Sequence, residues 1–163
     1  MDYMIMNALS REYLLDAFVS NVRDKYDYIL IDCSPSLNLV TINVLTASDS
    51  VIIPVEASYL SMTGLQQLLA SIGSTKRKLN RKLEVEGIVI NKVNTRTNHE
   101  KDIIGKLREA YGSQIKIFDV MIPESVRAKE CTAFGVSIYK HDGKGKVAKS
   151  FEELTREVME HGC

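Results

Sequence analysis

The sequence is short of cysteine and has no excess of either charge, and both features narrow the classes of protein to consider. Its 163 residues contain three cysteines, Cys33, Cys131 and Cys163, which are unclustered and form no CxxC pair. This spacing argues against a disulfide framework or a zinc site and favours a reducing compartment. Lysine plus arginine equals aspartate plus glutamate at 21 each, so no overall field favours nucleic acid or a membrane as partner.

Long hydrophobic runs and targeting signals are missing as well. The apolar stretches stay far below the roughly 18 residues that indicate a membrane span, and no signal peptide is evident. We therefore expect a cytoplasmic protein with no membrane partner. With 45% hydrophobic and 26% charged residues the composition is that of a globular protein, and the length suits a single domain over 1–163.

What the sequence does contain is an alternation of strand and helix patterns. Apolar runs without polar alternation predict strands that are buried on both faces, as in a parallel sheet covered by helices. The predicted strands are Tyr26–Ile31, Ser50–Val55, 85–92 and 116–123, with a short one at 136–139.

Apolar stripes at helical spacing lie between these strands. The first predicted helix follows Ser10, whose side chain we expect to cap it. Further helices are predicted at Leu37–Thr46, from about Ser61 past Ile72, at His99–Tyr111 and over Val147–Val158, whereas 124–135 is predicted as a loop. The alternation predicts an α/β fold with a mostly parallel sheet flanked by helices on both faces.

Asp32 comes directly after the apolar run Tyr26–Ile31. It would stand at the carboxyl end of a strand, where open α/β sheets place their chemistry. An acid there, followed by Ser34, Pro35 and Ser36, is typical of nucleotide-hydrolysing folds that hold magnesium.

Such folds also need a glycine-rich phosphate loop of the form GxxxxGK[ST]. The nearest segment is GKGKVAKS at 143–150, which has no glycine directly before Lys149 and follows the last predicted strand instead of the first. The favoured interpretation of this segment is a solvated turn that enters the final helix. A GxGxxG turn is also missing, which excludes a dinucleotide-binding fold of that type.

Three blocks of the sequence resemble the ParA/MinD/Soj family of deviant-Walker-A partition ATPases. They are YDYILIDCSPSLNLVTINVLTASDSVIIPVEASYLSMTGLQQLL at 26–69, EGIVINKVNTRTN at 86–98 and IPESVRAKECTAFGVSIYKHD at 122–142, and they follow one another in the family's order. The resemblance covers essentially the whole chain. The family's first strand, its KGGxGKT phosphate loop and its switch I aspartate have no counterpart, so the chain resembles a carboxyl-terminal part, either a truncated gene product or an excised fragment.

The resemblance implies roles for particular residues around a nucleotide. Asp32 is similar to the Walker B aspartate, which holds magnesium through water. Ser34 and Pro35 match the switch II turn, with Ser34 in place of the family's first proline. Asn91 matches an adenine-bonding position, and an amide suits that role because it donates and accepts. Pro123 and Glu124 match the loop that closes over the adenine.

Two further residues are similar to DNA-contacting arginines of the partition branch, Arg96 and Arg127. Glu124 stands where the family has an arginine, so we expect nonspecific DNA binding to be weak. The basic run at 76–82 is more simply a solvated helix end, with a phosphate-backbone patch as the alternative.

By resemblance, the parent function is ATP-dependent chromosome or plasmid partitioning, with ATP and magnesium as cofactors. Such a protein dimerises, coats DNA and responds to a centromere-binding ParB-type protein. Since the phosphate loop is missing, we expect no catalytic residue in this chain, no tight binding of ATP or magnesium, and no hydrolysis by it alone. The alternative is a non-catalytic interaction module or a remnant that docks on family members or on DNA.

The missing strand also has a structural consequence. In the family it lies between the counterparts of Tyr26–Ile31 and Ser50–Val55. We expect these two runs to close up and pair directly, because both are apolar on both faces and neither suits a sheet edge. Coverage by a second copy of the chain is the alternative.

Overall fold

The computed structural model of the chain describes residues 10–33, 38–94 and 98–161. The chain divides into two compact units, each drawn from two stretches of sequence. The first comprises Met1–Val51 and Gln66–Glu84, and the second comprises Ile52–Leu65 and Val85–Cys163. A single domain over 1–163 stays a prediction.

The first unit is mainly helical. It holds the 3-10 turns Arg11–Tyr13 (η1) and Arg23–Lys25 (η2), the helices Leu14–Ser20 (α2) and Leu39–Ala47 (α3), and the second part of Tyr59–Lys78 (α4). The predicted cap at Ser10 is wrong: this residue has a φ of 56° and its side chain caps nothing, because the chain enters α2 through a 3-10 turn.

Two asparagines organise the start of this unit. Asn38 caps α3 by accepting the N–H groups of Val40 and Thr41 at 3.0 and 3.2 Å. Asn43, which is 5% exposed, donates to the carbonyl of Arg11 at 2.8 Å and accepts the N–H of Leu15 at 3.2 Å. A buried amide with its groups bonded stabilises the contact of η1 and α2 with α3.

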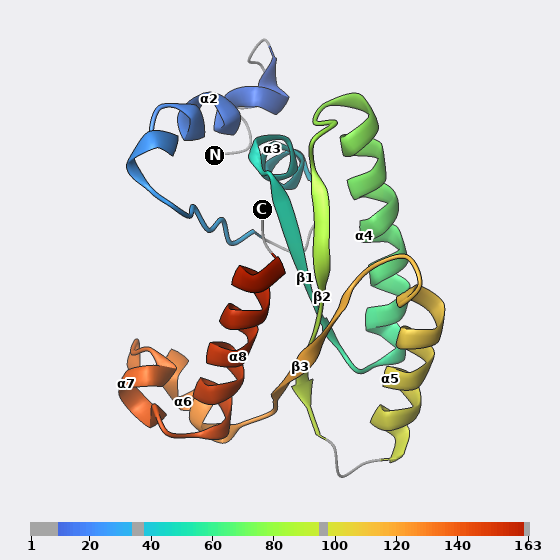
Figure 1. Ribbon diagram of the computed structural model, residues 1–163, viewed down its shortest axis with the longest axis vertical. Helices are drawn as coiled ribbons and strands as arrows, with labels where there is room; N and C mark the ends of the chain where they lie inside the picture. The colour runs from blue at the N-terminus through green and yellow to red at the C-terminus, as the bar shows by residue number, and fades with distance from the viewer. Residues whose placement is uncertain (1–9, 34–37, 95–97, 162–163) are drawn as a thin grey trace. The chain divides into compact units, whose positions relative to one another are not determined.

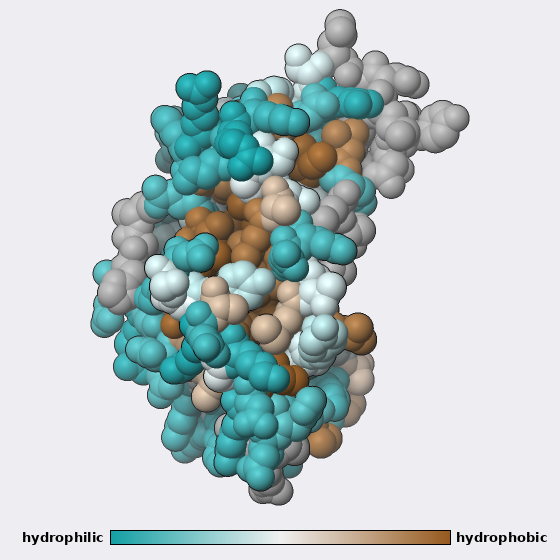
Figure 2. Space-filling view, turned by 90° about the vertical axis from the view of Figure 1, so that its right-hand side faces the viewer, coloured by the Kyte–Doolittle hydropathy of each residue, from teal (hydrophilic) through white to brown (hydrophobic). Residues whose placement is uncertain are grey.

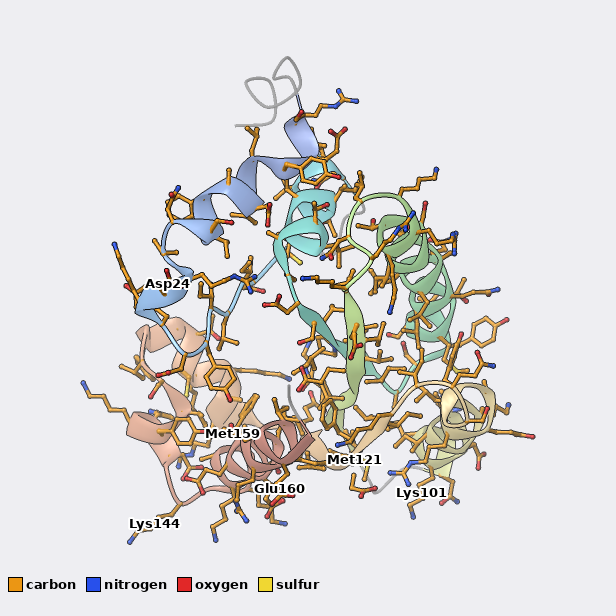
Figure 3. All side chains as sticks on the ribbon, turned by 45° about the horizontal axis from the view of Figure 1, so that its top comes forward. Asp24, Lys101, Met121, Lys144, Met159 and Glu160 are labelled. Atoms are coloured by element: carbon orange, nitrogen blue, oxygen red, sulfur yellow. The ribbon has the colours of Figure 1, made fainter. Side chains whose placement is uncertain are left out.

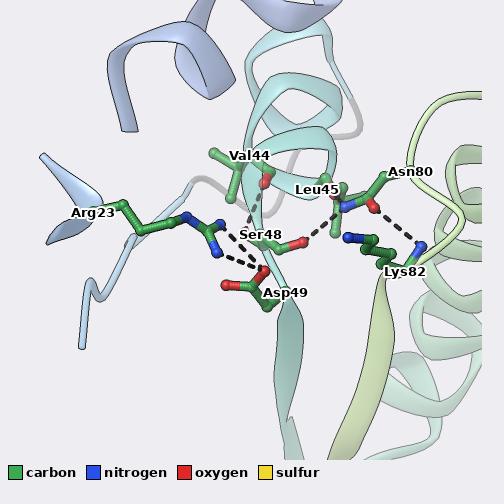
Figure 4. Close-up of polar contacts among 7 residues, drawn as sticks. All are labelled: Arg23, Val44, Leu45, Ser48, Asp49, Asn80 and Lys82. Atoms are coloured by element: carbon green, nitrogen blue, oxygen red, sulfur yellow. Dashed lines mark hydrogen bonds and ion pairs between the residues drawn. The ribbon is translucent and has the colours of Figure 1, made fainter. Parts of the chain in front are cut away.

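Polar contacts at the end of α3 hold the turn that leads into the first strand (Figure 4). Asn80 donates to the carbonyls of Leu45 and Ser48 at 3.0 and 2.7 Å. Arg23 pairs with Asp49 at 3.2 Å, and both side chains are largely exposed. The half-buried amide contacts of Asn80 therefore contribute more to stability than this surface ion pair.

The run Tyr26–Ile31 is not a strand, and this prediction is wrong. The segment is irregular apart from a bend, and Tyr28 and Leu30 are 65% and 93% exposed. It makes no ladder with the strand that begins at Ser50, so the predicted direct closure is wrong too. A strand needs a neighbour for its backbone groups, and an apolar sequence alone does not supply one.

The second unit contains the sheet (Figure 1). Its strands are Ser50–Glu56 (β1), whose first two residues belong to the first unit, Glu84–Val93 (β2) and Ile117–Pro123 (β3), in the order β1-β2-β3. β2 and β3 run parallel, with Ile88 opposite Ile117 and Ile90 opposite Met121. Between these pairs β2 advances two residues (88 to 90) and β3 four (117 to 121), so β3 bulges.

Helices Asn98–Tyr111 (α5) and Lys146–His161 (α8) lie on opposite sides of the sheet (Figure 1). On the α8 side, Val147 packs into a core with Val89, Phe118 and Ile122. Gly87 makes room for this core, since a Cβ there would come within 2.7 Å of the Phe118 ring. This architecture confirms the predicted α/β fold.

The outer edge of β3 is covered by a side chain of α8. Glu157 accepts the backbone N–H groups of Asp119 and Val120 at 3.1 and 3.4 Å, and Lys116 lies 3.4 Å from the same carboxylate. Burial alone would raise the pKa of Glu157, but these hydrogen bonds and the lysine outweigh it and lower the pKa. The bulge and the carboxylate together block strand addition at this edge.

Two elements after β3 differ from the prediction. The expected loop at 124–135 contains the helix Val126–Phe134 (α6), and the expected strand at 136–139 overlaps the short helix Ile138–Asp142 (α7). Gly135 ends α6 with a φ of 62°, and Ser137 caps α7 by accepting the N–H of Lys140. These capping contacts decide the conformation more strongly than the apolar residues of VSIY do.

Hydrophobic side chains also reach the surface, and one face of the molecule shows hydrophobic residues among hydrophilic ones (Figure 2).

Within the ranges 10–33, 38–94 and 98–161, no helix has both the length and the apolar character needed to cross a membrane.

Candidate nucleotide site at the carboxyl ends of the strands

The carboxyl ends of the three strands carry polar residues in the second unit. Glu56 ends β1, Asn91 and Lys92 lie near the end of β2, and Glu124 directly follows β3. The Glu124 N–H donates to the carbonyl of Val93 at 3.0 Å, which ties the last two strand ends together. This edge of an α/β sheet is where ligands are expected.

An ion pair joins the ends of β1 and β2. The Lys92 ammonium lies 2.5 Å from Glu56 Oε1, and both side chains are at least half exposed. The hydrogen bond and charge of Glu56 raise the pKa of Lys92, and Glu124 adds to this effect. Lys92 adopts a left-handed conformation with a φ of 53°, which is uncommon outside glycine, and it lies where the register between β2 and β3 shifts, between Ile90 and Val93.

Glu124 belongs to the same group of charges. Its Oε1 accepts a hydrogen bond from the Lys129 ammonium at 2.7 Å, which lowers the pKa of Glu124. The strand ends thus carry two negative and two positive side chains, Glu56, Glu124, Lys92 and Lys129. Their formal charges cancel, which leaves a weak electrostatic potential at this edge. An anionic ligand would have to compete with the two glutamates for these lysines.

Asn91, the predicted adenine-bonding residue, is half-buried near the end of β2. Its Oδ1 accepts the backbone N–H of Lys92 at 2.9 Å. The structure therefore brings Asn91, Pro123 and Glu124 to the same edge of the sheet, with the Asn91 oxygen already bonded within the chain. Whether they contact adenine stays a prediction.

Asp32 is exposed and lies in the first unit, after the irregular segment Tyr26–Ile31. Partial burial, with a contribution from Asp32, raises the pKa of the neighbouring Cys33 thiol. Among the described residues, no three His, Cys, Asp or Glu side chains form a group suited to a metal ion. The magnesium role of Asp32 stays a prediction, and Ser34, Pro35 and Arg96 lie outside the described residues.

Arg127, the other predicted DNA contact, is exposed on α6. Its guanidinium lies 3.4 Å from Glu130, which also meets His141 at 2.9 Å. The hydrogen bond from His141 lowers the pKa of Glu130, and Arg127 adds to the shift. Part of the Arg127 charge is therefore neutralised inside the chain.

Two shallow depressions lie in the second unit. One, of about 450 Å³, has Pro123 together with Lys149 and Ser150 in its lining, but Asp119 and Glu153 line it as well. Lys149 and Ser150 belong to the helix α8, so the interpretation of GKGKVAKS as the entry to that helix is confirmed.

The other depression is lined by residues of α5 and β3, including Ile104, Lys101 and Met121 (Figure 3 labels the last two). Only Met121 is common to both depressions.

Sequence reasoning missed Glu56, Lys92 and Lys129. A signal was present for the first two. Glu56 directly follows the predicted strand Ser50–Val55, Lys92 is the last residue of the predicted strand 85–92, and parallel strands end at one edge. Lys129 carried no such signal, since its helix α6 was predicted as a loop.

These features define an α/β protein whose parallel sheet carries polar residues at the carboxyl ends of its strands. Residues 1–85 match the AAA domain family. The sporulation initiation inhibitor protein Soj of Bacillus subtilis is 37% identical over 158 residues, 97% of this chain and 62% of that protein. The chromosome partitioning protein ParA of Myxococcus xanthus is 38% identical over 155 residues, 95% of this chain and 54% of that protein.

Among solved structures, the cobyrinic acid a,c-diamide synthase of Mycobacterium smegmatis with bound ADP and magnesium is 28% identical, with a TM-score of 0.69, and the match covers 76% of this chain and 49% of that one. The chain belongs to the ParA/MinD/Soj family of AAA-domain proteins, with a fold of the P-loop NTPase kind. It spans only 54–62% of the length of the two partition relatives.

The left-handed conformation of Lys92 yields a test of the strand end. Lys92→Gly and Lys92→Ala both remove the ion pair with Glu56, but only glycine adopts a φ of 53° without steric cost. We expect the glycine variant to melt about 2–4 °C above the alanine variant in thermal unfolding followed by circular dichroism. Equal melting temperatures would show that the left-handed conformation is not held in solution.

Proposed function

We propose that this chain is the part of a partition ATPase that contacts the adenine of ATP and the DNA. By itself it neither binds ATP tightly nor hydrolyses it. The observation that carries the proposal is the gathering of Asn91, Pro123 and Glu124 at one sheet edge in a chain whose 163 residues contain no phosphate loop. The family and the names of its partition relatives support the broader role.

The chemistry of the strand ends supports weak nucleotide binding. The Asn91 oxygen already accepts the Lys92 N–H, so only one of its two lone pairs is left for an adenine donor. The two lysines nearest this edge are already in ion pairs, Lys92 with Glu56 and Lys129 with Glu124, so the phosphates of ATP would have to compete with these glutamates. Phosphoryl transfer depends on groups that stabilise charge on the phosphates, and the phosphate loop supplies most of them.

Isothermal titration calorimetry of the full chain with ATP and magnesium tests the nucleotide part. We expect an affinity weaker than about 1 mM and no release of phosphate. The Mycobacterium smegmatis synthase, whose solved structure contains ADP and magnesium, serves as the positive control under the same conditions. A tight, magnesium-dependent isotherm from this chain would contradict the proposal and direct attention to Lys149 and Ser150.

We further propose weak DNA binding without sequence preference through Arg127 and Arg96. The balanced charge of 21 basic and 21 acidic residues supports weakness, and so does the pairing of Arg127 with Glu130. Phosphate contacts of this kind weaken with rising salt, because bound counterions are released from the DNA.

Fluorescence anisotropy with two duplexes of unrelated sequence tests this. We expect Arg127→Ala to weaken binding to both equally and to reduce the salt slope by about one. Arg156→Ala, an exposed arginine on α8, is the matched control and should change nothing. Binding that survives both Arg127→Ala and Arg96→Ala would exclude these arginines and favour the basic run at 76–82.

The second candidate function is a non-catalytic module that docks on other proteins. The observation that favours it is the exposure of apolar side chains in an extended segment, with Leu30 93% exposed. Such exposure is unusual for a protein that acts as a monomer.

A further inference from the structure

One carboxylate oxygen in the second unit is shared between an arginine and a histidine. Oε2 of Glu130 lies 3.4 Å from the Arg127 guanidinium and 2.9 Å from Nε2 of His141. Arg127 and Glu130 are one turn apart on α6, whereas His141 comes from α7. The charge state of the histidine therefore affects how strongly the carboxylate holds the arginine.

The fold places the histidine beside this carboxylate. The His141 side chain is only 19% exposed, and its ring centroid lies 5.8 Å from that of Phe134. The turn between the two helices is set by Gly135, with a φ of 62°, and by Ser137, which caps α7. A short, capped turn thus brings the imidazole of α7 to Glu130 on α6.

Glu130 is the acceptor in both contacts. The hydrogen bond from His141 lowers the pKa of Glu130 against the effect of burial, and the charge of Arg127 adds to the shift, so the carboxylate is ionised at neutral pH. An ionised carboxylate only accepts hydrogen bonds, so Nε2 carries the proton of the neutral imidazole and Nδ1 takes up the second one. Histidine is the side chain whose charge ordinarily changes between about pH 5 and pH 8.

The formal charge of the three side chains changes with that second proton. While His141 is neutral, the charges of Arg127 and Glu130 cancel. Once His141 is protonated, the cluster carries a net positive charge and the carboxylate is shared between two cations. The contact with Arg127 is the longer of the two, so the arginine is the partner that becomes available to an external anion.

The surroundings of this cluster are basic. Within the described residues, Glu130 is the one group in an ion pair with His141. The charged residues on α6, on α7 and at the start of α8, which packs against α7, are Arg127, Lys129, Glu130, Lys140, Asp142, Lys144, Lys146 and Lys149. Lys129 is paired with Glu124, and the Asp142 carboxylate lies against Gly145. An anion that approaches Arg127 therefore meets a positive local field in a chain that is neutral as a whole.

We infer that Arg127, Glu130 and His141 form a proton-controlled site for phosphate-type oxyanions. While His141 is neutral, Glu130 holds Arg127 and the site binds anions weakly. When His141 takes up a proton, Glu130 pairs with the histidine and the guanidinium is left to bind an oxyanion through two parallel hydrogen bonds. The oxyanion is a backbone phosphate of DNA or a free anion. For DNA, the assignment rests on the proposed role of Arg127 as a DNA contact.

Fluorescence anisotropy with a DNA duplex at about pH 6 and about pH 8, at equal ionic strength, tests the DNA case. Every sample carries His99→Gln and His161→Gln, so that His141 is the one histidine left. We expect binding to be about threefold to tenfold tighter at the lower pH, with a salt slope steeper by about one. His141→Gln should abolish this difference.

Glu130→Gln separates the proton-controlled site from a contact that merely holds α6 and α7 together. The substitution removes the carboxylate partner of Arg127, so we expect tighter DNA binding than in the unsubstituted chain at about pH 8. Weaker binding in Glu130→Gln would show a structural role and overturn the assignment.

Sulfate, whose charge is the same at both pH values, tests the free-anion case without DNA. A titration followed by the carbon-13 signal of Arg127 Cζ should give a dissociation constant about threefold to tenfold smaller at the lower pH, and His141→Gln should remove the difference. The corresponding signal of Arg156, an exposed arginine on α8, is the internal control and should show no such dependence on pH.

The DNA and sulfate measurements distinguish this site from the proposed DNA role. Sulfate binding at Arg127 that depends on pH, without DNA binding at either pH, would contradict the DNA role and support the site. A pH response with DNA alone would assign the site to backbone phosphates. DNA and sulfate affinities that are the same at both pH values, or a pH response that persists in His141→Gln, would overturn the assignment even if the chain binds DNA.

Discussion

A strand at the end of a sheet has backbone groups on one side that no neighbouring strand can bond. This protein meets that constraint at one end of its three-stranded sheet through the carboxylate of Glu157, which accepts two consecutive N–H groups of β3. Both N–H groups lie within the bulge of β3, between Ile117 and Met121, and α8 brings the carboxylate to them. The packing of α8 on the sheet therefore depends on a polar contact as well as on its apolar stripe.

The same sheet sets the positions of the candidate functional residues. Parallel strands end together, so Glu56, Asn91, Lys92 and Glu124 come from three separate stretches of sequence to one edge. Their charges are mostly satisfied among themselves, which leaves an arrangement that is held in place without phosphate.

Sequence patterns predicted β1, β2, β3 and the helices α3, α4, α5 and α8, because each buries an apolar face against a neighbour within the chain. They failed at Tyr26–Ile31, where the pattern is that of a strand but the structure has no ladder. They failed again at α6 and α7, where Gly135 and Ser137 decide the turns locally. Of the candidate site, the strand-end residues were predictable, whereas the lysine–glutamate pairing depends on side-chain geometry that no spacing encodes.

Amide hydrogen exchange at β3 tests most directly whether a side chain closes this edge. The account predicts that Glu157→Ala speeds exchange of the Asp119 and Val120 amides by about tenfold or more, the effect of losing one hydrogen bond. Glu153→Ala, an exposed glutamate one turn earlier on α8, should leave both rates unchanged. Equal exchange rates in the wild-type chain and Glu157→Ala would contradict the account.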